Sequence, residues 1–169
     1  MKLRSVIALS LPLIGSSVMA ANLAVKLDIP QLNVAEYHRP YLALWLEDPD
    51  QKFVANLAVL YDVKKKDNAG AKWLKDMRQW WRKSGRDLTL PIDGVSGATR
   101  APGTHTLAIP GAQLEKLPAG HYQVVVEAAR ESGGRELVRV PIDWPPKTAL
   151  TVPAKGVEEL GNVVVQLQP

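Results

Sequence analysis

The sequence predicts a mainly β protein: an antiparallel, immunoglobulin-like β-sandwich of about seven strands with one inserted amphipathic helix. Three observations support this fold class. Short apolar runs recur along the chain, turn residues separate them, and the hydrophobic period changes from two to about 3.6 over one stretch only. No internal repeat or low-complexity linker divides the chain, so we expect a single domain over residues 21–169.

The first 20 residues have the composition of a secretory signal peptide. Lys2 and Arg4 precede a short apolar run at residues 6–14, and small residues then lead to Ala20. We expect cleavage after Ala20 and export to the periplasm, because the run is too short for a transmembrane helix. The chain contains no cysteine, which excludes disulfides, thiolate chemistry and a lipid anchor on a cysteine.

The charge balance limits the class of partner. Without Lys2 and Arg4, 19 basic residues face 17 acidic ones, so residues 21–169 carry a formal charge of +2. A charge this small, together with export, argues against nucleic-acid binding. No later stretch is apolar enough to span a bilayer, so the protein is not expected to be membrane-spanning.

Most of the predicted strands follow from period-two alternation. Residues 22–29 alternate large apolar side chains with polar or small ones and predict a half-buried strand. Residues 41–47 are apolar on both faces and predict a central strand. Tyr122 resembles the tyrosine-corner position of immunoglobulin-like domains. Further strands are predicted over residues 53–61, 104–109, 150–152 and 163–167, and as a hairpin within 117–142 that turns at 131–134.

The change of period predicts one helix over about residues 69–84. Its apolar face comprises Trp73, Leu74, Met77, Trp80 and Trp81, and its basic face Lys72, Lys75, Arg78, Arg82 and Lys83. We expect Asp67 or Asn68 to cap its start and Gly85 to end it in a left-handed conformation. The apolar face is suited to packing on a sheet. Trp81, at its margin, is the ring we expect to be free to stack on a planar cofactor, with the basic face beside it pairing with a phosphate.

The sequence predicts no metal site and no catalytic residue. His38, His105 and His121 lack metal-ligand spacing, and the scattered carboxylates form neither an acid–base pair nor a complete calcium loop. The segment around Ser96 has alanine where a nucleophile elbow needs its second glycine, and no acid–histidine pair follows in the expected order. A serine hydrolase is therefore not expected.

Residues 93–99, DGVSGAT, combine a turn pair with two hydroxyls, and the glycines and proline that follow predict an exposed loop up to residue 103. The segment resembles D-x-x-[ST]-G-A-[ST], the flavin-attachment motif of exported FMN-carrying proteins. The specified positions are matched by Asp93, Ser96, Gly97, Ala98 and Thr99. The resemblance implies that a flavin transferase moves FMN from FAD onto Thr99 as a phosphoester, with the preceding residues as its recognition sequence. Arg100 could balance the charge of the phosphodiester.

Longer segments resemble a family of predicted periplasmic proteins, domain of unknown function 2271, over roughly residues 25–167. They are YLALWLEDPD, KWLKDMRQWWR, DGVSGATRAPGTH and LPAGHYQVVVEAARESGG. The resemblance implies a periplasmic flavoprotein that relays electrons from a PepSY-type membrane reductase to an acceptor such as ferric complexes. It would be an electron-transfer protein more than a stand-alone enzyme. The residues alone leave open a different class, a non-redox immunoglobulin-like binding module of the cell envelope, in which DGVSGAT is only a turn.

Overall fold

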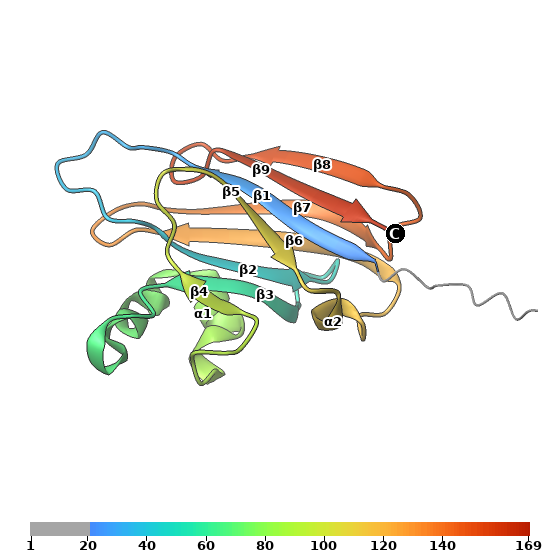
Figure 1. Ribbon diagram of the computed structural model, residues 1–169, viewed down its shortest axis with the longest axis horizontal. Helices are drawn as coiled ribbons and strands as arrows, with labels where there is room; N and C mark the ends of the chain where they lie inside the picture. The colour runs from blue at the N-terminus through green and yellow to red at the C-terminus, as the bar shows by residue number, and fades with distance from the viewer. Residues whose placement is uncertain (1–20) are drawn as a thin grey trace, which may run out of the picture.

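The computed structural model describes residues 21–169, so the expected signal peptide and its cleavage site lie outside the described residues. The chain forms a four-stranded sheet, in the order β5-β1-β9-β8, and a five-stranded sheet, in the order β4-β3-β2-β6-β7 (Figure 1). The strands are β1 (Asn22–Ile29), β2 (Tyr41–Glu47), β3 (Phe53–Tyr61), β4 (Ser96–Ala98), β5 (Gly103–Ile109), β6 (Gly120–Ala129), β7 (Arg135–Trp144), β8 (Leu150–Lys155) and β9 (Asn162–Gln168). The mainly β class is confirmed.

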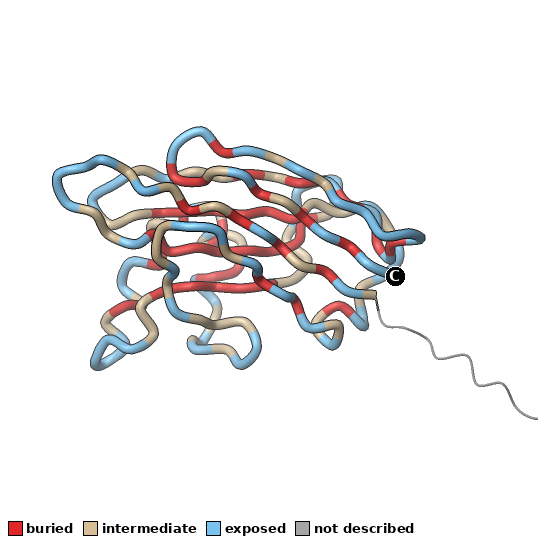
Figure 2. Tube along the Cα trace, turned by 45° about the horizontal axis from the view of Figure 1, so that its top comes forward, coloured by how far each residue is buried: buried red, intermediate tan, exposed pale blue. Residues whose placement is uncertain are grey.

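The two sheets face each other across one apolar core. The inward side chains of β1, such as Val25 and Leu27, pack in the same buried cluster as Leu42 and Leu44 of β2. Figure 2 shows buried segments in both layers. Successive side chains of a strand point to opposite faces. The apolar residues of the alternation in residues 22–29 therefore lie on the face of β1 that packs against the other sheet.

The predicted central strand, β2, is buried along its whole length and bonds to β3 on one side and β6 on the other. Its second face is covered by a helical layer on the outside of the five-stranded sheet (Figure 1). There Trp45 of β2 packs in one cluster with Met77 and Trp80. Burial on both faces explains why this strand shows no polar alternation.

The prediction of one helix over about residues 69–84 is wrong. The segment divides into a 3₁₀ helix, η1 (Lys66–Asp76), a six-residue α-helix, α1 (Arg78–Lys83), and a short 3₁₀ turn, η2 (Gly85–Asp87). The break lies at Met77, where ψ is 74°. The backbone N–H groups of Gln79 and Trp80 donate to the buried carboxylate of Glu127. A continuous helix would direct those groups to carbonyls four residues earlier.

The expected ends of that helix are also wrong. Asp67 and Asn68 both have φ near 53° and make no side-chain cap bond. Gly85 lies in η2 and is not among the glycines with positive φ. A Cβ at Gly85 would approach the Trp80 ring to 2.5 Å, so close packing accounts for the glycine. Trp73 is 37% exposed and does not belong to the buried face.

Two short elements were not expected. Residues 96–98, predicted as part of a loop, form β4, which pairs in parallel with the edge of β3. The bonds that hold it include Val59 N–H to the carbonyl of Val95 at 2.9 Å and Thr99 N–H to the carbonyl of Tyr61 at 3.3 Å. A single turn of helix, α2 (Gly111–Leu114), follows β5. Elements of three or four residues are too short to show a hydrophobic period.

Candidate functional site

Thr99 is the first residue after β4, at the end of the five-stranded sheet where β2 begins and where β3 and β6 finish. The strand register places it there: Ala98 pairs with Tyr61, and Tyr41 pairs with Ala129. Four segments that are distant in sequence therefore meet beside Thr99. None of this can be inferred from the local sequence around residue 99, because it depends on which strands are neighbours.

These segments form a cavity of about 300 Å³, which we call the Thr99 groove. It is lined by Tyr37, His38, Arg39, Tyr41, Asp62, Lys65, Thr99 and Glu131. The walls come from the β1–β2 connection, the start of β2, the segment after β3, the residue after β4 and the β6–β7 hairpin. A volume near 300 Å³ is at the lower end of the range for small-molecule sites.

The charged groups of the Thr99 groove are only partly matched to one another. Lys65 Nζ lies 3.3 Å from an oxygen of Asp62. His38 lies 3.8 Å from a carboxylate oxygen of Glu131 and 3.3 Å from one of Glu36. Arg39, which is exposed, forms no ion pair within residues 21–169. The groove thus offers a guanidinium group that the described part of the chain does not neutralise.

Two tyrosines supply the neutral part of the groove. Burial raises the pKa of Tyr37, and burial together with the negative charge of Asp62 raises the pKa of Tyr41 to about 12. Both phenols are therefore neutral hydrogen-bond donors at physiological pH. The hydroxyl of Tyr37 is buried and has no hydrogen-bond partner among the described residues. Such groups are rare because leaving one unpaired costs free energy, and the charges that act most on this phenol, Arg130 and Glu159, lie outside the lining of the groove.

The other residues of DGVSGAT shape the turn that leads to β4. Asp93 Oδ1 accepts a hydrogen bond from Gly94 N–H at 3.1 Å, and Ser96 Oγ accepts one from Ile92 N–H at 2.9 Å. Gly94 has φ 71°, which favours glycine. These bonds account for the turn without any modification. Of the predicted attachment residues, Thr99 alone lines the groove; Ala98 and Arg100 are exposed outside it.

Trp81, the predicted stacking residue, lies elsewhere. It lines a second cavity of about 300 Å³ together with Lys75, Arg78, Arg82 and Arg135. Arg135 begins β7, whereas Thr99 follows β4, and these are the two opposite edges of the five-stranded sheet. The structure therefore does not bring Trp81 and Thr99 into one pocket.

Sequence reasoning missed the aromatic residues that do lie near Thr99. Tyr37 belongs to the β1–β2 connection, which has no hydrophobic period, and Tyr41 was interpreted only as part of a strand. The available signal was the cluster YHRPY at residues 37–41, where two tyrosines flank a histidine and an arginine immediately before a central strand. Binding residues often lie in segments that connect strands or helices, which makes this cluster a candidate site.

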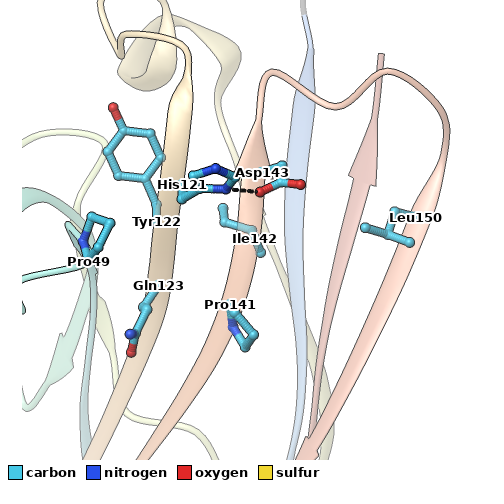
Figure 3. Close-up of a pocket in the computed structure, with 8 residues that line it drawn as sticks. All are labelled: Pro49, His121, Tyr122, Gln123, Pro141, Ile142, Asp143 and Leu150. Carbon is cyan, nitrogen blue, oxygen red and sulfur yellow. Dashed lines mark hydrogen bonds and ion pairs between the residues drawn. The ribbon is translucent and has the colours of Figure 1, made fainter.

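A third cavity, of about 290 Å³, lies on β6 and β7 near their other end (Figure 3). His121 Nδ1 and Asp143 Oδ1 are 2.5 Å apart across the two strands, and both side chains are exposed. The residues that line the cavity include no serine, threonine, cysteine or lysine, so a nucleophile for this pair is absent from it. Tyr122 Oη donates to the carbonyl of Pro118 at 2.9 Å, as expected for a tyrosine corner.

Residues 21–169 contain no group of three or more histidine, aspartate or glutamate side chains arranged to hold a metal ion. In the same part of the chain, no helix has the length and apolar character needed to cross a membrane.

Comparison with known proteins gives a family. The family described as Predicted periplasmic protein (DUF2271) matches residues 22–162, which include every strand from β1 to β8 and both Thr99 and the residues of its groove. No curated protein and no solved structure matches the chain.

Proposed function

This chain belongs to the DUF2271 family of predicted periplasmic proteins, and we propose that it is a flavoprotein carrying FMN as a phosphoester on Thr99. One observation carries the proposal. Within the segment that resembles a flavin-attachment motif, the residue that the resemblance implies as acceptor is the one that lines a groove of ligand size. The resemblance was read from sequence spacing, whereas the groove depends on strand topology, so the two arguments are independent.

Attachment needs a hydroxyl that another enzyme can reach. In the proposed modification, Thr99 Oγ attacks the phosphorus of the FMN half of FAD, the P–O bond to the AMP half breaks, and AMP leaves. The hydroxyl proton passes to the flavin transferase. The bond from Thr99 N–H to Tyr61 holds the backbone, and the side chain of Thr99 is half-exposed. Gly97 and Ala98 add little bulk beside it.

The groove residues fit the polar part of such a cofactor. Among residues 21–169 Arg39 forms no ion pair, and Lys65 adds a second cation from another wall of the groove, so both are suited to the negative phosphodiester. Tyr37 and Tyr41 add neutral phenol side chains to the lining. FMN, when bound, would supply transfer of one or two electrons. Covalent attachment would keep the cofactor on a protein that works outside the cytoplasm.

The proposal includes partners. A flavin transferase would load the protein, a PepSY-type membrane reductase would supply electrons, and an acceptor such as ferric complexes would receive them. In this scheme the chain exposes and positions the cofactor and performs no substrate chemistry of its own.

Mass measurement tests the proposal directly. The chain is co-produced with a flavin transferase in an exporting host, denatured and desalted, and its intact mass is recorded. We expect an increase equal to one FMN less one water, with in-gel flavin fluorescence. Thr99→Ala abolishes both signals, and Thr89→Ala, at an exposed threonine of the preceding loop, retains them. An unmodified wild-type mass overturns the proposal, and a signal that survives Thr99→Ala overturns the site.

The second candidate function is a non-redox, immunoglobulin-like binding module. Its support is the strand order: β3-β2-β6-β7 follows the C′-C-F-G order of a variable-type sheet, and the β1–β5 pair corresponds to strands B and E. The bond of Tyr122, at the start of the strand that would be F, agrees with this correspondence. In this alternative the bonds of Asp93 and Ser96 have a structural role only, and the mass experiment gives no FMN.

A further inference from the structure

We propose that the cavity around Trp81, here called the Trp81 groove, is a binding site for a nucleotide-like ligand: a planar aromatic group that carries phosphate. The site is separate from Thr99 and does not depend on FMN attachment. Trp81 and Thr99 line different cavities at opposite edges of the five-stranded sheet.

Positive side chains converge on this groove from three elements. Lys75 comes from η1, Arg78 and Arg82 come from successive turns of α1, and Arg135 comes from β7. The groove measures about 300 Å³, and its lining includes no acidic residue. A concave site lined by one sign of charge focuses the field and attracts the opposite ion.

The described part of the chain leaves most of this charge unmatched. Among residues 21–169, Lys75, Arg78 and Arg82 form no ion pair, and the Nε–H of Arg82 donates to the backbone carbonyl of Arg78. Arg135 alone has a carboxylate partner, Glu127, at 3.0 Å. Three unpaired cations around one cavity repel one another, so an anion placed among them lowers the free energy.

The groove lies in a segment that concentrates positive charge. Residues 64–87 contain nine basic and three acidic residues, a formal charge of +6. The remainder of residues 21–169 contains ten basic and fourteen acidic residues, a formal charge of −4. The near-neutral total therefore conceals a strongly polarised molecule, and the positive side is the helical layer.

One buried side chain holds parts of two walls of the groove. The buried carboxylate of Glu127 accepts from Trp80 N–H at 2.8 Å and from Gln79 N–H at 3.1 Å, which holds the first turn of α1. The same carboxylate holds Arg135. Both the helix and the strand that form the site are thus tied to one buried group, and such preorganisation reduces the entropic cost of binding.

The position of Trp81 points to a planar ligand. Its neighbour Trp80 is fully buried and donates from Nε1 to Asn56 at 2.8 Å. The two indole rings lie 6.3 Å apart at 55°, so Trp80 supports one side of Trp81 while Trp81 remains half-exposed beside the cations. Indole and guanidinium faces stack on flat rings, and guanidinium groups bind phosphate through paired N–H donors. A nucleotide offers both features in a molecule small enough for the groove.

Calorimetric titration of the chain at physiological ionic strength tests the proposal, with AMP, adenosine and inorganic phosphate as probes. We expect one AMP to bind at least about tenfold more tightly than either adenosine or phosphate. Adenosine lacks the phosphate that the cations bind, and phosphate lacks the planar ring that stacks on Trp81. Arg78→Gln with Arg82→Gln weakens AMP binding at least about tenfold. Lys72→Gln with Arg86→Gln removes equal charge from exposed positions outside the groove and changes binding less than about twofold.

Each result decides the proposal. Equal weakening by the two double variants, or AMP binding no tighter than phosphate, overturns it in favour of diffuse attraction of anions. Binding of vesicles with anionic lipid in the absence of saturable AMP binding also overturns it. Trp81→Leu, with folding checked by circular dichroism, is expected to reduce the affinity for AMP to that for phosphate. Thr99→Ala retains AMP binding, so failure of FMN attachment and failure of this site are distinguished.

Discussion

At the scale of single residues, buried carboxylates hold the outer layer of this protein in place. Glu47 and Glu127 are both fully buried, yet each is matched by cations from other elements. Glu47 accepts from Lys83 at 2.8 Å and from Arg139 at 3.0 Å. Burying a charge is costly unless it is paired and hydrogen-bonded, so removing the carboxylate leaves its donors without partners.

Glu127→Ala is therefore expected to destabilise the protein by about 2–4 kcal/mol, because it leaves two backbone N–H groups of α1 unbonded. Arg135 is 37% exposed, so its guanidinium can regain water and adds less to the loss. Urea unfolding followed by tryptophan fluorescence measures the change. The control is Glu115→Ala, at an exposed position directly after α2, with an expected effect within about 0.5 kcal/mol. A loss below about 1 kcal/mol for Glu127→Ala would show that α1 is held by packing alone.

At the scale of elements, the helical layer shows where sequence patterns suffice and where they do not. Strand β1 could be predicted from the sequence because its alternation of apolar and polar residues matches the burial of each residue. The break at Met77 could not be predicted, because Glu127, which accepts the N–H groups that follow the break, lies 47 residues from Trp80 in the sequence. Buried Leu74, Met77 and Trp80 follow the predicted face, but the exposure of Trp73 does not. A helical period in the sequence predicts which side chains are buried together. Whether these residues form one continuous helix depends on tertiary hydrogen bonds, which the period does not show.

The same limit applies to the candidate sites. Thr99 is predicted as an attachment site from a local spacing, which a sequence displays directly. The groove beside it requires that β4 pair with β3 and that β2 lie between β3 and β6, so its tyrosines could not be linked to Thr99 in advance. Three of the five residues of the predicted basic face, Lys75, Arg78 and Arg82, do line a cavity with Trp81, whereas Lys72 and Lys83 do not. The separation of this cavity from Thr99 follows from the strand order, which places β4 and β7 at opposite edges of the five-stranded sheet.

Gly85 provides an element-scale prediction that separates two explanations for one glycine. If it ended a helix in a left-handed conformation, asparagine would be tolerated better than alanine. Because its space is instead filled by the Trp80 ring, we expect Gly85→Ala to cost about 1–3 kcal/mol and Gly85→Asn, with its larger side chain, to cost more. Urea denaturation of both variants gives the order. Asparagine costing less than alanine would contradict the steric explanation.

At the scale of the whole molecule, ionised carboxylates also join the layers to one another. Glu136 of β7 accepts backbone N–H groups of Val157, Glu158 and Leu160 in the β8–β9 connection, and so links the two sheets. Asp28 of β1 accepts from Thr104 at 2.6 Å and from Asn162 at 2.9 Å, which links three strands of the smaller sheet. These contacts favour the charged form of each carboxylate, because protonation turns one oxygen into a hydroxyl, which accepts hydrogen bonds more weakly.

This preference predicts how the protein responds to acid. Burial raises the pKa of Glu136, but bonds from the backbone N–H groups outweigh it and hold the pKa below its ordinary value of 4.5. Hydrogen bonds from Thr104 and Asn162 hold the pKa of Asp28 below 3.8. For Glu47, burial is outweighed by Lys83, Arg139 and Trp45, and its pKa also lies below 4.5. The unfolded chain therefore binds protons before the folded one, and stability present above pH 4.5 is lost as the pH falls through the lowered values.

Urea unfolding at a series of pH values checks this response. We expect a nearly constant midpoint between about pH 6 and pH 5 and a progressive fall below about pH 4.5. Glu136→Gln keeps the size of the side chain but cannot ionise, so the variant is expected to be less stable than the wild type near pH 6 and to lose less stability in acid. The two curves then approach each other at low pH. Parallel curves would mean that Glu136 binds protons equally in both states and that its bonds across the two sheets do not depend on its charge.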